Sequence, residues 1–191
     1  GGAHVFPGGA VDAADSDEAL VAACAGLDDA EASRRLGVSD GGLAYWICAM
    51  RECFEEGGLL YAYAGDALAR FDSPEPGTFG DIVTSRGWRL AADRLAYLSH
   101  WITQAGRPRR YDTRFFLAVA PGNQDVRHDN HEATAHIWVR PREALELCAN
   151  ETINMRLPTI KTLERFAACA TAAELLAELS SAPEVRALLP R

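Results

Sequence analysis

A nine-residue run in the first third of the chain is the most informative part of the sequence. It is Arg51-Glu52-Cys53-Phe54-Glu55-Glu56-Gly57-Gly58-Leu59. The run closes a pattern that predicts a helix from Leu43 to Glu56, ended by the two glycines. At about 100° per residue, the apolar side chains of this helix share one face, and Glu52, Glu55 and Glu56 lie on the other. The helix is expected to bury one side and to gather three carboxylates on the opposite side.

Three neighbouring carboxylates repel one another, so a partner must offset their repulsion. One explanation is a solvated face, on which Arg51 and Glu55 form a surface ion pair worth about 0.3 to 0.5 kcal/mol. The charge pattern by itself is more typical of this explanation. The other is a divalent cation, because Mg²⁺ and Mn²⁺ are hard ions that bind carboxylate oxygens.

The same nine residues match the second half of the Nudix box, Arg-Glu-apolar-x-Glu-Glu-x-Gly-apolar, at every defined position. The first half of that box is Gly-x5-Glu, and Phe6-Pro7-Gly8-Gly9 resembles the loop from which it begins. Five residues after this loop stands Asp15, where the family has Glu. The 35 residues 16–50 then separate Asp15 from Arg51, where the family has seven. On these residues the chain resembles the Nudix hydrolases, with a box interrupted by about 28 residues.

This interruption resembles that of one branch of the family, the coenzyme A diphosphatases related to the mammalian peroxisomal enzyme. Other segments look like segments shared by that branch, namely His100-Trp101-Ile102-Thr103, Arg110-Tyr111-Asp112-Thr113 and Phe115-Phe116-Leu117. The resemblance implies an α/β fold, a Nudix-type α/β/α sandwich with a mixed sheet, a helical insertion at 16–42 within the box and a helical C-terminus. Residues 1–191 are expected to form a single Nudix domain. Because such a domain normally has about two strands before its Phe-Pro-Gly-Gly loop, we expect the natural protein to be longer at its N-terminus.

Local patterns predict the other elements. The insertion should contain two short helices, the second capped by Asp28 and ended by Gly37. Ser39 or Asp40 should cap the carboxylate helix. Strands at 95–103 and 111–120 should form a hairpin. The remaining expected elements are a strand at 59–63, a helix within 78–90, a strand at 134–139, and helices at 141–149, 159–170 and 172–179.

The resemblance assigns a role to each residue of the box. Glu55 and Glu56 would bind Mg²⁺ or Mn²⁺, and Glu52 would be either a third ligand or the general base. The Gly8 carbonyl would complete the inner shell, since glycine lets backbone oxygen approach an ion closely. Arg51 would pair with the glutamates and hold their rotamers.

Two further acids are less clearly assigned by the resemblance. Many relatives add a metal ligand from a late loop, for which Glu132 is the candidate and Asp129 the rival. Asp15 has a shorter side chain than the family's Glu, so it is expected to reach a structural hydrogen bond only. The spacing of His128 and His131 would suit zinc, but no cysteine lies nearby and a Nudix site uses oxygen ligands.

The resemblance also implies a reaction and a substrate class. The reaction is hydrolysis of the pyrophosphate bond of a nucleoside diphosphate linked to another group, with coenzyme A or acyl-CoA favoured. Arg107, Arg109 and Arg110 form either a solvated turn or a site for the phosphate that distinguishes coenzyme A from other ADP derivatives. Trp101 is either a core residue or part of an adenine pocket. The alternatives are ADP-ribose or a dinucleotide as substrate, and a ligand-sensing Nudix domain without catalysis, which usually has broken box acids.

Composition excludes several other classes of protein. The 191 residues carry a net charge of −8, from 19 Lys and Arg against 27 Asp and Glu, which argues against a nucleic-acid partner. No apolar run reaches the roughly 18 to 20 residues that span a bilayer. The five cysteines are scattered without a Cys-x-x-Cys pair, which is typical of a reducing compartment. We therefore expect a cytoplasmic protein with a small-molecule partner and neither nucleic acid nor membrane, with a homodimer as an open alternative to a monomer.

Overall fold

The computed structural model describes residues 2–71, 77–106, 108–126, 136–181, 185 and 187–188 of the chain. The chain divides into two compact units. One consists of Gly1–Phe6 and His136–Ala182, and the other of Pro7–Ala135 and Pro183–Arg191. The single domain expected over residues 1–191 stays a prediction.

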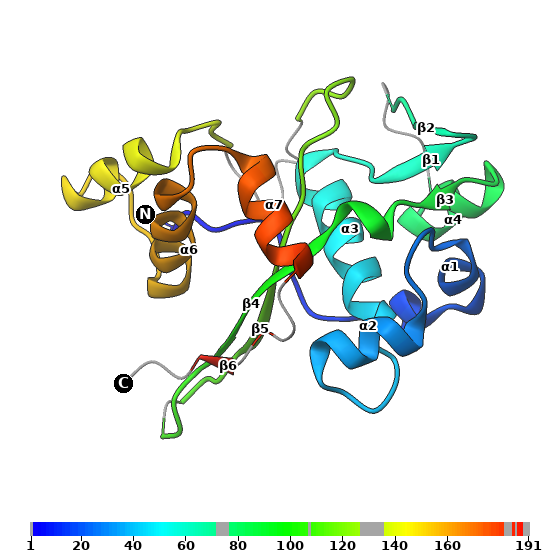
Figure 1. Cartoon of the computed structure of the whole chain (residues 1–191), viewed down its shortest axis with the longest axis horizontal. Coiled ribbons are helices and arrows are strands. Elements are labelled where there is room, and N and C mark those ends of the chain that lie inside the picture. Colours follow the sequence, from blue (N-terminus) through cyan, green and yellow to red (C-terminus); the bar gives the residue numbers. More distant parts are fainter. Residues whose placement is uncertain are drawn as a thin grey trace. The chain divides into compact units, whose positions relative to one another are not determined.

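The larger unit contains the interrupted box and its insertion (Figure 1). The 3-10 helix η1 (Ala13–Ser16) is followed by α1 (Glu18–Ala23), α2 (Asp29–Leu36) and α3 (Leu43–Gly57). As predicted, the Asp28 side chain caps α2 by accepting a hydrogen bond from the backbone N–H of Glu31 at 2.8 Å. The helix ends at Gly37, whose φ of 69° favours glycine. The predicted helices of the insertion are thus confirmed.

The start of α3 lies where the sequence predicts it, but its cap was predicted wrongly. Gly42 occupies the N-cap position, and neither Ser39 nor Asp40 bonds to the first turn. Instead, Asp29 of α2 accepts a hydrogen bond from Leu43 N at 2.9 Å. A cap from another helix cannot be recognised by a rule that examines only the residues adjacent in sequence.

A small antiparallel sheet follows α3 in the chain. Its central strand β1 (Ala62–Ala64) pairs with β2 (Ala67–Leu68) on one side and with β3 (Arg89–Leu90) on the other. Helix α4 (Phe79–Ser85) connects β2 to β3. Its N-terminus is closed by a capping box between Thr78 and Asp81. The strand predicted at 59–63 therefore exists, and it begins three residues later than expected.

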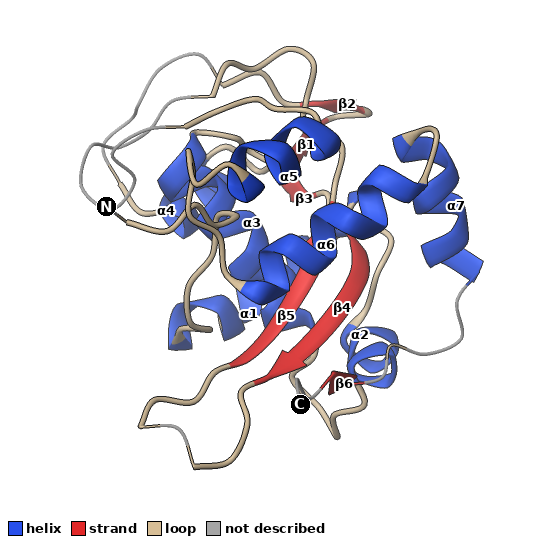
Figure 2. Ribbon diagram, turned by 90° about the vertical axis from the view of Figure 1, so that its left-hand side faces the viewer, coloured by secondary structure: helices blue, strands red, loops and turns tan. Residues whose placement is uncertain are grey.

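The second sheet contains the predicted hairpin. Strand β4 (Ala96–Ile102) pairs antiparallel with β5 (Asp112–Leu117) and parallel with β6 (Ala187–Leu188), so this sheet is mixed, as predicted. Figure 2 shows the two long strands of the hairpin lying side by side. The register shifts between Tyr97 and Ser99, which marks a β-bulge.

The apolar face of α3 packs into the core of this unit. Trp46, Ile47 and Met50 are completely buried. The Trp46 ring lies 4.8 Å from the ring of Phe116 on β5, and its Nε1 donates to the carbonyl of Leu95 at 3.2 Å. Burying one such side chain contributes about 1.5 to 3 kcal/mol. The core thus holds α3 by one face and leaves its acidic face toward the loop that precedes η1.

The smaller unit is helical, as predicted for the C-terminus. It contains α5 (Pro141–Ala149), α6 (Leu157–Ala168) and α7 (Ala172–Ser181). The N-terminal residues join it through His4, whose N–H donates to Asn154 O at 2.7 Å. Its core consists of Ala144, Met155 and Leu163 with partly buried neighbours that include Phe6 and Phe166.

Of the strand expected at 134–139, residues 134–135 lie outside the described residues and 136–139 are not in a strand. Within the described ranges, no helix combines the length and the apolar character needed to cross a bilayer.

Candidate active site

Arg51 lies at the centre of the box acids. Its Nε and Nη2 donate to the two carboxylate oxygens of Asp15 at 2.8 and 3.0 Å. Its Nη1 donates to Glu52 Oε1 at 2.7 Å and to Glu55 Oε2 at 3.0 Å, and Nη2 also reaches the carbonyl of Ala10 at 3.1 Å. These bonds, those to Asp15 first, hold the pKa of Arg51 above its usual range. The guanidinium therefore stays charged and offsets the repulsion among the acids.

Asp15 is fully buried behind this arginine. It also accepts a hydrogen bond from Asp12 N at 2.8 Å, within the capping box of η1. A buried carboxylate is tolerated only when it is paired and hydrogen-bonded. Asp15 thus makes a structural contact, the kind that its shorter side chain led us to expect.

Glu52 is the buried acid of α3, only 8% exposed. It lies directly against Gly9, where an added Cβ would stand 2.3 Å from Glu52 Oε1. Only glycine leaves room for this carboxylate. A solvated face is therefore the wrong explanation for Glu52, although Glu55 on the same face is exposed.

Gly8, whose carbonyl is predicted to bind a metal ion, contacts the acidic face through its N–H. Gly8 N donates to Glu56 Oε2 at 3.3 Å. A Cβ at Gly8 would meet nothing within 4 Å, in contrast to Gly9. The loop before η1 thus lies over the acids of α3, with Gly8 facing Glu56 and Gly9 facing Glu52.

The donor chemistry of this face suits a hard divalent cation, because it offers three carboxylates on consecutive turns of α3. In their present conformation the acids bind other groups. Glu52 and Glu55 share the guanidinium of Arg51, and Glu56 accepts from Gly8. Across the part of the chain that the structure describes, no three metal-ligating side chains converge on one point. The late-loop candidates Glu132 and Asp129, with His128 and His131, lie outside that part.

The predicted substrate-binding residues lie on the hairpin of β4 and β5. Trp101 is half-buried on β4, and its indole Nε1 is buried without a hydrogen-bond partner among the described residues. At the turn, the Arg109 guanidinium lies 5.3 Å from the centre of the Tyr111 ring, and Arg110 Nε donates to Thr103 O at 3.2 Å. The turn projects away from α3 in both views (Figures 1 and 2). The structure does not bring these arginines together with the box acids, and Arg107 lies outside the described residues.

Sequence reasoning missed Gln124, which follows β5. Its Oε1 accepts from Leu60 N at 2.8 Å, and its Nε2 donates to the carbonyls of Leu60 and Ala69, both at 2.9 Å. This side chain ties the segment after β5 to the residues that directly follow the carboxylate helix. No local pattern distinguishes it from any other loop glutamine.

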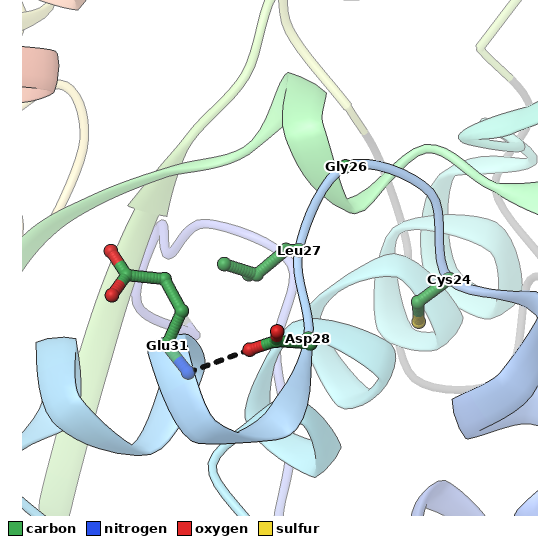
Figure 3. A pocket seen from close by; sticks show the side chains of 5 residues that line it. All are labelled: Cys24, Gly26, Leu27, Asp28 and Glu31. Atoms are coloured by element: carbon green, nitrogen blue, oxygen red, sulfur yellow. Dashed lines mark hydrogen bonds between the residues drawn. The ribbon is translucent and has the colours of Figure 1, made fainter.

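A pocket of about 380 Å³ opens in the insertion (Figure 3), lined by Cys24, Gly26, Leu27, Asp28 and Glu31. Hydrogen bonds from Arg34 and Arg35 lower the pKa of Glu31 to about 2, and burial raises the pKa of the Cys24 thiol to about 12. None of the box acids lines this pocket. The acidic face of α3 therefore remains the candidate active site.

The chain is similar to known proteins in sequence and in fold. The family model of the NUDT19 Nudix domain matches residues 1–166. The chain is 30% identical over 213 residues to acyl-coenzyme A diphosphatase NUDT19 of Gallus gallus, covering 86% of this chain and 56% of the relative. It is 29% identical over 219 residues to the Homo sapiens protein of the same name, covering 91% and 58%. The chain thus spans a little more than half the length of these curated relatives.

A solved structure shows the same fold. It is the crystal structure of a NUDIX hydrolase from Alicyclobacillus acidocaldarius, with a TM-score of 0.72 and 25% identity, covering 91% of this chain and 79% of that one. The similarity confirms the predicted α/β fold of Nudix type. The second half of the box is intact on α3, and the bond between Asp15 and Arg51 closes the interrupted box. Because the family model also matches most of its length, the chain belongs to the Nudix family, in the group of the NUDT19 Nudix domain.

Proposed function

We propose that this chain is a metal-dependent hydrolase that cleaves the pyrophosphate bond of a nucleoside diphosphate linked to another group, with coenzyme A or acyl-CoA as its substrate class. One observation carries the proposal. Arg51 joins Asp15, Glu52 and Glu55 in one network, so the interrupted box is closed in space. The names of the two NUDT19 relatives, acyl-coenzyme A diphosphatases, support the substrate class.

The acids of α3 would have different roles in the reaction, because they differ in solvent exposure. Buried Glu52 accepts a hydrogen bond from Arg51 through its Oε1. Its Oε2 has no hydrogen-bond partner among the described residues and can accept a proton from water. Exposed Glu55 and half-buried Glu56 face the solvent side, where a phosphate would approach. Glu55, Glu56, the Gly8 carbonyl and Glu132 would hold Mg²⁺ or Mn²⁺, with Glu52 as a further ligand in its alternative role. The bound ion would neutralise the phosphate oxygens and polarise the phosphoryl group.

The reaction adds one water to the pyrophosphate. The water oxygen bonds to one phosphorus, the bond from that phosphorus to the bridging oxygen breaks, and the bridging oxygen leaves with the other phosphate. Two roles are open to Glu52: as the general base it takes the proton of the attacking water, and in the alternative role it is the third metal ligand. Coenzyme A would give adenosine 3',5'-bisphosphate and phosphopantetheine, and acyl-CoA would give the acylated phosphopantetheine.

Other candidates differ in the substrate or in catalysis. ADP-ribose and dinucleotides contain the same pyrophosphate bond, and the box acids alone do not distinguish them from coenzyme A. A ligand-sensing domain without catalysis is disfavoured, because Glu52, Glu55 and Glu56 are all present. The role of Arg107, Arg109 and Arg110 at the 3'-phosphate stays a prediction.

The test is a product screen by mass spectrometry. Coenzyme A, acyl-CoA, ADP-ribose, NADH and diadenosine polyphosphates are incubated with the protein and Mg²⁺ or Mn²⁺, with EDTA and the Glu56→Gln variant as controls. We expect adenosine 3',5'-bisphosphate from the first two, in the presence of metal only. Preferred cleavage of ADP-ribose would replace coenzyme A by ADP-ribose as the substrate class. The absence of product from every compound would refute the proposal.

A further inference from the structure

We infer that Asp29 of the insertion is a positioning residue of the active site, because it fixes the start of the helix that carries the box acids. Asp29 Oδ1 accepts from Leu43 N at 2.9 Å, and its Oδ2 accepts from Gly41 N at 3.0 Å. Between them, Gly42 N donates to Ser33 Oγ at 2.9 Å. Three consecutive N–H groups at the start of α3 thus bond to side chains of α2.

These bonds replace a cap that α3 does not have. The first N–H groups of a helix have no partner within the helix, and no side chain of the N-cap residue Gly42 can supply one. Asp29 itself is the first residue of α2, capped in turn by Asp28. The start of α3 is therefore bonded to Asp29 and Ser33 of α2, and α2 determines where α3 begins.

Close backbone packing makes this link rigid. A Cβ at Gly42 would stand 2.3 Å from Ser33 N and 2.5 Å from Ser33 Cα. These are backbone atoms of α2, which cannot move aside as the end of a side chain can. Ser33 and its neighbour Ala32 are both buried, 3% and 0% exposed. The first turn of α3 has one position against α2.

The link matters because the insertion separates the two halves of the box. In a box of ordinary length, a short connection keeps the acid of the first half near the arginine of the second. Here the bond between Asp15 and Arg51 closes a loop of 35 residues, which costs more chain entropy than a short connection. Contacts within the insertion must therefore bring Arg51 back to Asp15. Asp29 supplies such a contact by accepting a hydrogen bond from Leu43 N, eight residues before Arg51.

A displaced start would be transmitted along the helix to the acids. Glu52, Glu55 and Glu56 share one rigid helix with Leu43, so a shift or rotation of its first turn moves all three carboxylates relative to Gly8 and Gly9. Catalytic geometry is sensitive to displacements of about 1 Å. Asp29 touches none of the groups assigned to substrate or metal and acts only through the position of α3.

The experiment compares Asp29→Ala with Asp28→Ala. Both remove a carboxylate that accepts backbone N–H bonds in the insertion, but Asp28 serves only α2. We expect Asp29→Ala to lower kcat by roughly 10-fold or more with little change in KM. Asp28→Ala should leave kcat within about 2-fold of the wild type at a similar loss of Tm. Asp29→Asn, which keeps an acceptor oxygen for Leu43 N, should restore most of kcat.

Amide hydrogen exchange supplies a readout without catalysis. Exchange at residues 41–47 should accelerate in Asp29→Ala, whereas Asp28→Ala should accelerate exchange within α2. The inference rests on the proposed function for its kinetic part only. If the wild type cleaves no substrate, the proposed function fails and the exchange at 41–47 still decides whether Asp29 holds α3. Unchanged exchange there, or a kcat loss no greater than that of Asp28→Ala, would overturn the inference.

Discussion

Arg51 and Asp15, 36 positions apart in sequence, form a bidentate ion pair with N to O distances of 2.8 and 3.0 Å. Two parallel hydrogen bonds between a guanidinium and a carboxylate fix orientation as well as distance. Asp15 is completely buried, and the Arg51 side chain is only 15% exposed. The pair therefore joins η1 to the acidic face of α3 and leaves Arg51 Nη1 directed at Glu52 and Glu55.

Removing the buried carboxylate should destabilise the fold strongly. Asp15→Ala leaves the charge of Arg51 without its main partner, and breaking a buried pair in this way costs about 3 to 5 kcal/mol. Asp17→Ala removes an exposed cap of α1, which accepts from Ala19 N at 2.8 Å, and should cost about 0.5 to 2 kcal/mol. Urea unfolding of both variants measures the difference. Equal losses would mean that the pair contributes no more than a surface cap.

The acids of α3 should matter for turnover more than for folding. Glu55→Gln or Glu56→Gln is expected to lower kcat by at least about 10²-fold, because each removes a carboxylate proposed to hold the metal ion that stabilises the charge of the transition state. Circular dichroism should show an intact fold. Glu18→Gln, on α1 of the insertion, should not change kcat. An equal loss in all three variants, or none in any, would contradict the proposed roles.

The two glycines of the loop before η1 should respond differently to the same substitution. In Gly9→Ala the new Cβ would meet the end of the Glu52 side chain at 2.3 Å. The Glu52 side chain can rotate away at little cost in stability. This rotation would displace its carboxylate from the position proposed for catalysis, so kcat should fall by roughly 10-fold or more. Gly8→Ala, which meets nothing within 4 Å, should keep nearly full activity. Steady-state kinetics with a Tm for each variant tests this, and a larger effect at Gly8 would contradict it.

Metal binding can be tested without a substrate. A ligand that binds only the folded state raises stability by RT ln(1 + [L]/Kd), about 2.7 kcal/mol at 100 times its Kd. Mn²⁺ should therefore raise the Tm of the wild type in a concentration-dependent way. The double variant Glu55→Gln, Glu56→Gln should lose this shift. A shift of equal size in both proteins would place the metal elsewhere.

Substrate choice should depend on the arginines of the hairpin turn if they hold the phosphate of coenzyme A. Arg109→Ala should then raise KM for coenzyme A by roughly 10- to 100-fold, the scale of one charge-assisted hydrogen bond. Dephospho-coenzyme A lacks that phosphate, so its KM should not change. A variant that merely disturbed the hairpin would affect both substrates. An unchanged KM for coenzyme A would exclude Arg109 from the substrate site, in agreement with the direction in which the turn projects.

Much of the molecule follows from neighbouring residues alone. The helix of the box acids, its end at Gly57 and Gly58, the cap of α2 at Asp28 and the hairpin of β4 and β5 each depend on residues a few positions apart. Such features obey the 3.6-residue period, the capping preferences and the turn signals that a sequence displays directly. Local sequence patterns therefore predict the family, the helix that carries the box acids and the identity of those acids.

The contacts among those residues, in contrast, depend on the tertiary structure. Asp15 pairs with Arg51, 36 positions away in sequence. Asp29 caps α3 through Leu43, 14 positions away, in place of the predicted caps Ser39 and Asp40. Gln124 bonds to Leu60, 64 positions away. The tertiary structure also makes Gly9, and not Gly8, the glycine that touches Glu52, and it buries Glu52 while leaving Glu55 exposed. Burial and long-range hydrogen bonds depend on which surfaces pack together, and no periodicity within one helix or one loop contains that information.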